Sequence, residues 1–216
     1  MKTWLIAFLF SGLTACDYVG GERIDGTTVQ PVTPVVVHEV TGYYFSSEDV
    51  LTYLHPVRMF EERGLYERSD GSLEVSHADT HNLVIKLHPL VLPDDRDDIK
   101  QALVDQALLY GILKVFTHTE VEWLDLQVTP LIAGTGLQQS VTYGTTPKRH
   151  VALSRAQAQA FLRAHSPART FSELVDTDQN WHHLRGADSL IFTELYYTPD
   201  RPTELARILS QQYAPK

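Results

Sequence analysis

The chain has 216 residues, which is enough for one ordinary domain or two small ones. Apolar residues make up 43% and charged residues 21%, which is typical of a soluble globular protein and argues against a disordered, collagen-like or multi-span membrane chain. The 18 basic and 27 acidic side chains give a net charge of −9, so the chain lacks the cationic surface that dominates affinity for nucleic acids.

The first 17 residues have the three parts of an export signal. Lys2 forms a short basic start, residues 4–10 are apolar, and residues 11–15 are mostly small. The apolar part is too short to cross about 30 Å of hydrocarbon, which needs about 20 residues. Cys16 follows directly and is the only cysteine of the chain, so no disulfide can form within the chain.

The sequence Leu13-Thr14-Ala15-Cys16 resembles the lipobox of bacterial lipoprotein precursors. The resemblance implies that the chain is cut before Cys16, which then carries a diacylglyceryl group and an acyl chain such as palmitate. It also implies that no free thiol remains, so that disulfides, cysteine catalysis and cysteine-ligated zinc are all excluded. Two or more acyl chains hold a protein stably on a membrane. Asp17 resembles the signal that keeps such lipoproteins in the inner membrane. An ordinary signal peptide, or a buried N-terminal helix with a chance cysteine, would be the alternative.

The predicted organisation therefore has three parts. Residues 1–15 are a lipoprotein signal peptide, residues 16–41 a lipid-anchored flexible tether, and residues 42–216 a single globular domain. The tether is rich in Gly and Thr and contains two Pro residues three positions apart.

The N-terminal third of the domain carries signals for a helix and a hairpin. Ser46 and the acids after it predict a helix start, and Pro56 predicts the end or a kink of that helix. Asp70-Gly71, between two short alternating segments in residues 65–75, predicts a hairpin.

The middle of the domain carries a strand–helix–strand pattern. Residues 83–88 and 121–128 alternate between apolar and polar side chains, as half-buried strands do. Between them, residues 98–116 predict the longest helix, with acids at its start where the helix dipole favours them. Gly111 leaves an alternative open, in which the helix ends early and residues 112–116 form a strand. The apolar positions of the helix are Ile99, Leu103, Val104, Ala107, Leu108, Ile112 and Val115.

The C-terminal third predicts further strands and short helices. Residues 141–153 predict a strand interrupted at 144–147, and Ser154 with Gln157 forms a capping box for a helix to about Ala164. Thr170 and Glu173 repeat this device, the composition of residues 190–197 favours a strand, and Asp200 is expected to cap a last amphipathic helix.

His77 and His81 are weak candidates for a metal site. Their spacing would place both imidazoles on one face of a helix, where they could hold Zn²⁺. Because the segment lies between two strand signals, a turn is the preferred interpretation, and no Glu follows His77 as in the metalloprotease motif. The prediction is therefore that the chain needs neither a metal nor a cofactor.

Other patterns offer weaker chemistry. Trp181-His182-His183 with Asp188 forms a second polar cluster, but adjacent side chains point in different directions. The acids of residues 94–98 lack the spacing of a calcium loop, and helix capping explains them better. Residues 134–136 contain only a fragment of a phosphate loop. Each of the pairs 43–44 and 196–197 is expected to place one tyrosine in the core and one at the surface.

These observations lead to one fold and two functions. We predict an α+β domain, with a mixed sheet of about five or six strands and the 98–116 helix packed on one face. The favoured function is a membrane-tethered periplasmic lipoprotein, with an envelope protein as partner, that acts as a non-catalytic binding or envelope-assembly domain. The alternative is an envelope hydrolase or metal-dependent enzyme that uses His77, His81 or residues 181–183. A pocket with convergent polar groups would favour the enzyme, and an exposed apolar patch the binding domain.

Overall fold

The computed structural model describes residues 42–63, 65–79, 81–134, 140–176, 179 and 190–215. The predicted signal peptide, lipid attachment site, retention signal and tether all fall in residues 1–41, which lie outside the described residues.

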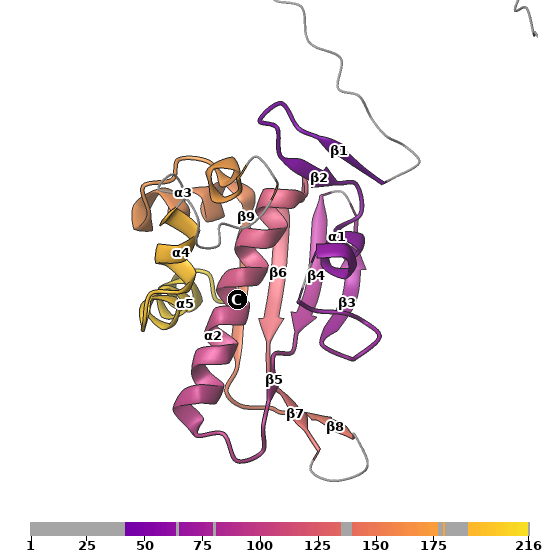
Figure 1. Cartoon of the computed structure of the whole chain (residues 1–216), viewed down its shortest axis with the longest axis vertical. Helices are drawn as coiled ribbons and strands as arrows, with labels where there is room; N and C mark the ends of the chain where they lie inside the picture. The colour runs from indigo at the N-terminus through magenta and orange to yellow at the C-terminus, as the bar shows by residue number, and fades with distance from the viewer. Residues whose placement is uncertain are drawn as a thin grey trace, which may run out of the picture. The chain divides into compact units, whose positions relative to one another are not determined.

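A four-stranded mixed sheet lies at the centre of the described part (Figure 1). Its strands are β3 (Leu73–Ala78), β4 (Asn82–Leu87), β6 (Trp123–Val128) and β9 (Arg149–Ser154), in the order β3-β4-β6-β9. Strands β4 and β6 are parallel, and the two outer pairs are antiparallel. Alternate side chains of β4 and β6 are buried on one face, which agrees with the alternation predicted from the sequence.

Helix α2 (Asp97–His118) packs on this buried face and connects the two parallel strands. It extends the predicted 98–116 helix by one or two residues at each end. Gly111 does not end it. A methyl group at Gly111 would lie 2.8 Å from side-chain atoms of both Leu87 and Leu126, so glycine is needed for the close approach of α2 to the sheet.

Two smaller sheets flank the central one. β1 (Tyr43–Phe45) pairs with β2 (Leu51–Tyr53), and helix α1 (Pro56–Arg63) follows. The other small sheet contains β5 (Leu90–Val91), β7 (Leu131–Ala133) and β8 (Val141–Tyr143), in the order β5-β7-β8. Because β5 and β7 directly follow β4 and β6, this sheet continues the central one beyond one end of its strands (Figure 1).

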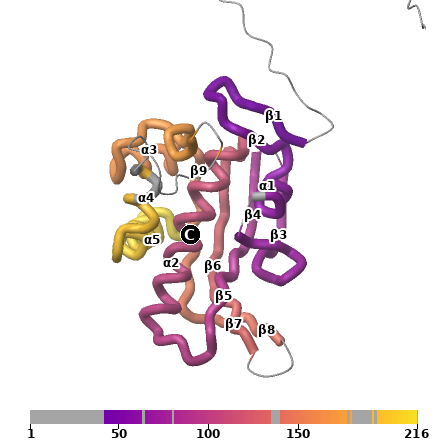
Figure 2. Tube along the Cα trace, in the orientation of Figure 1, coloured from indigo at the N-terminus to yellow at the C-terminus, as the bar shows by residue number. Residues whose placement is uncertain are grey.

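The C-terminal third adds helices beside α2. These are α3 (Arg155–His165), the short 3-10 helix η1 (Phe171–Leu174), α4 (Leu190–Tyr196) and α5 (Arg201–Gln212). In Figure 2 they form the orange and yellow part of the trace, and α3, η1, α4 and α5 all contact α2. The capping box predicted at Ser154 and Gln157 is present at the start of α3.

The α+β class and the helix packed on a sheet are confirmed. The strands are divided among sheets of four, three and two strands in the described residues, instead of forming one sheet of five or six. The chain leaves the central sheet after β4 and again after β6, at His88-Pro89 and at Thr129-Pro130. A proline has no N–H to donate to a ladder, so each proline marks the end of a central strand.

The prediction for residues 46–56 is wrong. Ser46 Oγ accepts hydrogen bonds from the backbone N–H groups of Glu48 and Val50, but these close the turn between β1 and β2 instead of starting a helix. Pro56 begins α1 instead of ending a helix. Proline is favoured in the first turn of a helix because its missing N–H would have no partner there.

Four further predictions need correction. Only the second segment of residues 65–75 forms a strand, and Gly71 with a φ of 79° lies in the turn before it. Residues 190–197 are mostly helix α4, whose contacts with α5 and η1 override β propensity. Thr170 and Asp200 precede η1 and α5 as predicted, but neither side chain makes a capping hydrogen bond.

Candidate functional site

The face of the central sheet opposite α2 is mostly polar and half-exposed. The strand register places Glu74 of β3 beside Lys86 of β4, Lys86 beside Gln127 of β6, and Gln127 beside His150 of β9. Lys86 Nζ lies 2.7 Å from Glu74 Oε2. Such a face suits a sheet that packs helices on one side only.

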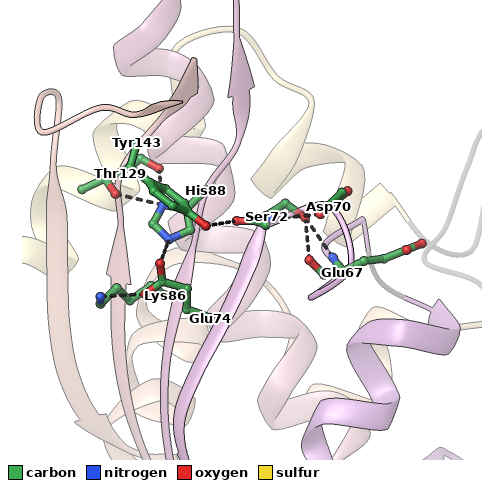
Figure 3. Close-up of polar contacts among 9 residues, drawn as sticks. Glu67, Asp70, Ser72, Glu74, Lys86, His88, Thr129 and Tyr143 are labelled. Carbon is green, nitrogen blue, oxygen red and sulfur yellow. Dashed lines mark hydrogen bonds and ion pairs between the residues drawn. The ribbon is translucent and has the colours of Figure 1, made fainter. Parts of the chain in front are cut away.

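A pocket of about 330 Å³ lies where β8 and the residues after it meet this polar face. Glu74, Lys86 and Gln127 come from the sheet, His88 and Thr129 from the residues just after β4 and β6, and β8 with the segment after it supplies the rest. The lining is Glu74, Lys86, His88, Gln127, Thr129, Tyr143, Gly144, Thr145 and Lys148. We call it the His88 pocket (Figure 3).

His88 is the buried group of this pocket, with only 3% of its surface exposed. Its Nδ1 atom lies 3.1 Å from the carbonyl oxygen of Thr129 and 3.0 Å from the hydroxyl oxygen of the same residue. The Tyr143 ring packs against the imidazole at 4.6 Å between centroids. The Nε2 atom points toward Glu74 (Figure 3), but its distance of 3.5 Å from Glu74 Oε1 is too long for a hydrogen bond of normal length.

The charges of the pocket follow from these contacts. The hydrogen bond from Lys86 lowers the pKa of Glu74, so this carboxyl is ionised at neutral pH. Burial lowers the pKa of His88, while the charge of Glu74 acts in the opposite direction. The pocket therefore holds a neutral, buried imidazole beside an exposed carboxylate–ammonium pair.

Thr129, His88 and Glu74 form a hydroxyl–imidazole–carboxylate series, the order found in hydrolase triads. The carbonyl oxygen of Thr129, however, only accepts hydrogen bonds, and its contact with Nδ1 favours the imidazole form protonated at that atom. An imidazole protonated at Nδ1 does not accept the hydroxyl proton of Thr129 there. The geometry therefore supports binding at this pocket better than nucleophilic catalysis.

A larger pocket of about 640 Å³ lies beside β1, the end of α2 and the start of α3. Arg155 is the cation of its lining. The Arg155 guanidinium donates hydrogen bonds to three backbone carbonyl oxygens at and just after the C-terminal end of α2, those of Phe116, Thr119 and Val121. The Tyr44 hydroxyl donates to Glu120. The cation and the tyrosine of this pocket are therefore both engaged in contacts within the fold.

The predicted histidine candidates lie at the β3–β4 hairpin. His77 is in β3 and His81 lies just before β4, so the turn expected from the sequence is present and the helical geometry is absent. Asp79 Oδ1 accepts hydrogen bonds from the backbone N–H groups of His81 and Asn82, and its Oδ2 lies 2.9 Å from His77 Nε2. These bonds hold the pKa of Asp79 well below its usual range.

The remaining candidate site residues from the sequence lie partly outside the described residues. Cys16, Asp17, residues 181–183 and Asp188 lie outside the described residues. In the acidic run, Asp97 and Asp98 lie in the first turn of α2, but the N-cap residue is Arg96 and its side chain makes no capping hydrogen bond, so the predicted cap is absent. Asp98 pairs with Arg96, and Asp95 accepts a hydrogen bond from the backbone N–H of Leu92. No group of three or more potential metal ligands occurs among the described residues.

Each tyrosine pair was expected to place one ring in the core and one at the surface, and neither pair does so fully. Tyr44 is buried and Tyr43 half-buried, whereas at the second pair Tyr196 is half-buried and Tyr197 exposed. Tyr196 packs on Tyr110, with 6.2 Å between ring centroids.

Sequence reasoning did not identify the His88 pocket. Its lining residues were assigned to separate predicted strands: Lys86 and His88 belong to the strand predicted over residues 83–88, and Gln127 to the strand predicted over residues 121–128. Their contacts with Glu74 and Thr129 depend on strand register, which one sequence does not supply. Comparison of the chain with protein-family models, curated proteins and solved structures finds no match.

Proposed function

We propose that this chain is a bacterial lipoprotein anchored through Cys16, retained at the periplasmic face of the inner membrane by Asp17, and acting as a non-catalytic binding or envelope-assembly domain. The anchor rests on the Leu13–Cys16 sequence. Among the described residues, no helix is long and apolar enough to span a membrane.

The binding role rests on one observation: three exposed apolar side chains line the same groove. The groove has a volume of about 480 Å³ and is lined by Leu65, Leu90 and Val141, which are 72%, 59% and 49% exposed. Leu103 of α2 also lines it. We call it the β5–β8 groove. Clustered exposed apolar side chains favour a protein partner because their burial would stabilise the complex.

The chemistry of the partner follows from the surroundings of the groove. Asp70 also lines it, no Lys or Arg does, and the chain as a whole carries a net charge of −9. A segment with apolar side chains and flanking basic residues would match both the apolar lining and the acidic charge. We therefore propose an envelope protein that presents such a segment.

The anchor is tested by cell fractionation of the full chain and of its Cys16→Ser variant. Lipid attachment predicts that the wild-type chain stays with the membrane and that the variant remains uncut or becomes soluble. A Cys16→Ser chain that is still cleaved after Ala15 and still sediments with membranes would contradict the anchor.

The groove is tested by placing a photo-cross-linking residue at Leu90 in the full chain, with Glu61 on the exposed face of α1 as the matched control position. We expect one discrete cross-linked partner from position 90, its loss in a Val141→Glu background, and no such product from position 61. The same products from both positions, or a product that persists with Val141→Glu, would refute the groove as the binding surface while leaving the anchor intact.

A further inference from the structure

The His88 pocket is a site of positive charge on an acidic protein. The described residues contain four lysines, at positions 86, 100, 114 and 148, and two of them line this pocket. Glu74 is the one carboxylate of its lining. The lining therefore carries a net charge of +1 with His88 neutral, in a chain whose net charge is −9. A local excess of cations that opposes the charge of the whole chain concentrates anions at that place.

Several hydrogen-bond donors of the pocket are uncommitted. Within the described residues, the side chains of Gln127, Thr145 and Lys148 make no hydrogen bond or ion pair. An amide, a hydroxyl and an ammonium group together supply donors of the three kinds that hold oxyanions in proteins. Their arrangement around one pocket of about 330 Å³ leaves room for a small ligand.

Lys86 is the fourth donor and is held in place by Glu74. The Glu74 side chain is 37% exposed, so its carboxylate can turn to water when another anion takes its place beside Lys86. The Lys86 ammonium group carries three N–H donors, and its hydrogen bond to Glu74 at 2.7 Å uses one of them. A bound oxyanion and Glu74 can therefore also share the ammonium group.

His88 supplies the second, independent observation. Its Nε2 atom is buried and points toward Glu74 (Figure 3), but the nearest Glu74 oxygen is 3.5 Å away, beyond the normal length of a hydrogen bond. Buried polar atoms without a partner are rare in folded proteins, and they are found where a ligand, an ion or a proton completes the site. In the neutral imidazole with its proton on Nδ1, Nε2 is an acceptor. A bound oxyanion would favour protonation of His88, and Nε2 would then donate to the anion while Nδ1 keeps its hydrogen bond to the Thr129 carbonyl.

We propose that the His88 pocket binds an oxyanion, a phosphate or carboxylate group, between Lys86 and Lys148. The ligand is either a free solute anion or the phosphate of a lipid headgroup, since both present the same oxygens to the two lysines. This site is separate from the β5–β8 groove and does not depend on the function proposed for it, although His88 borders both.

The experiment is a titration of the full chain in nonionic detergent, followed through the imidazole resonances of His88 by NMR. Inorganic phosphate, glycerol phosphate and acetate are added in turn at constant ionic strength. His165, which packs on Phe161 in α3, is the internal reference. The variants are Lys86→Gln and Lys148→Gln, and the matched control is Lys100→Gln, a lysine of α2 that does not line the pocket.

We expect a saturable shift of His88 with at least one anion and no shift of His165. Each pocket variant should weaken binding roughly tenfold, because a hydrogen bond to a charged group typically contributes that much. If glycerol phosphate binds more tightly than inorganic phosphate, the ligand is the phosphate of a lipid headgroup. If inorganic phosphate binds more tightly, the ligand is a free anion. The proposal is overturned if no anion gives a saturable shift, or if Lys100→Gln weakens binding as much as Lys148→Gln. Lys148 is exposed, so this variant keeps the fold.

Discussion

Replacing Gly111 by alanine tests whether packing or local helix preference controls this position of α2. In an exposed helix the change would stabilise by about 1 kcal/mol, because alanine is the better helix former. Here the new methyl group would lie 2.8 Å from both Leu87 Cδ1 and Leu126 Cδ2, and both leucines are fully buried. Overpacking of this kind costs about 1–3 kcal/mol. With the helix preference offsetting about 1 kcal/mol of that cost, we expect Gly111→Ala to lower the free energy of unfolding by about 0–2 kcal/mol.

The assay is denaturant unfolding followed by circular dichroism, with two accompanying variants. Ala102→Gly, at a half-buried position of the same helix, measures the helix preference on its own and should cost about 1 kcal/mol. Leu126→Val removes one of the two obstructing groups, so Gly111→Ala should cost less in that background. If Gly111→Ala stabilises the otherwise unchanged chain, α2 does not approach the sheet as closely as described and the reasoning fails.

Three further outcomes are expected. Asp105→Ala should destabilise the chain by about 3 kcal/mol, since it leaves Arg149 without its fully buried partner at 2.7 Å; a loss below about 0.5 kcal/mol in urea unfolding would contradict this. Leu108→Ala should cost about 2–5 kcal/mol and Leu103→Ala clearly less, because Leu108 is fully buried and Leu103 borders the β5–β8 groove; equal losses would be inconsistent with that placement. Burial lowers the pKa of His88 from its ordinary value of 6.5, so its contribution to stability is complete above about pH 6.5 and is lost as the pH falls through the folded-state pKa. His88→Gln should remove that part of the pH dependence of the urea midpoint, and an unchanged profile would count against it.

The central layer of the fold was predictable because its pattern is local. The alternation of residues 83–88 and 121–128 and the apolar stripe of residues 98–116 each report which side of an element is buried. The capping box at Ser154 is likewise a signal that spans only four residues. In all of these the burial pattern and the local preference agree, which is the condition under which a single sequence specifies its structure.

The errors fall where the same local signal fits two structures. Ser46 accepts backbone N–H groups in a turn as readily as at a helix start, and Pro56 suits the first turn of a helix as well as the position after one. Helix α4 consists mostly of residues that favour strands, and its buried Leu195 packs into the core. Such cases are decided by tertiary contacts, which no window of sequence contains.

The candidate site is harder to predict than the fold because its parts come from separate strands. Glu74 and Lys86 are twelve residues apart, and His88 and Thr129 are 41 apart, yet each pair is in contact. The parallel pairing of β4 with β6 aligns Leu87 with Val128, so the residues just after both strands meet at the same end of the sheet. That end is where β8 and Lys148 return over the polar face. A buried histidine with an unsatisfied nitrogen arises there from topology, since the crossover through α2 brings the two strand ends together.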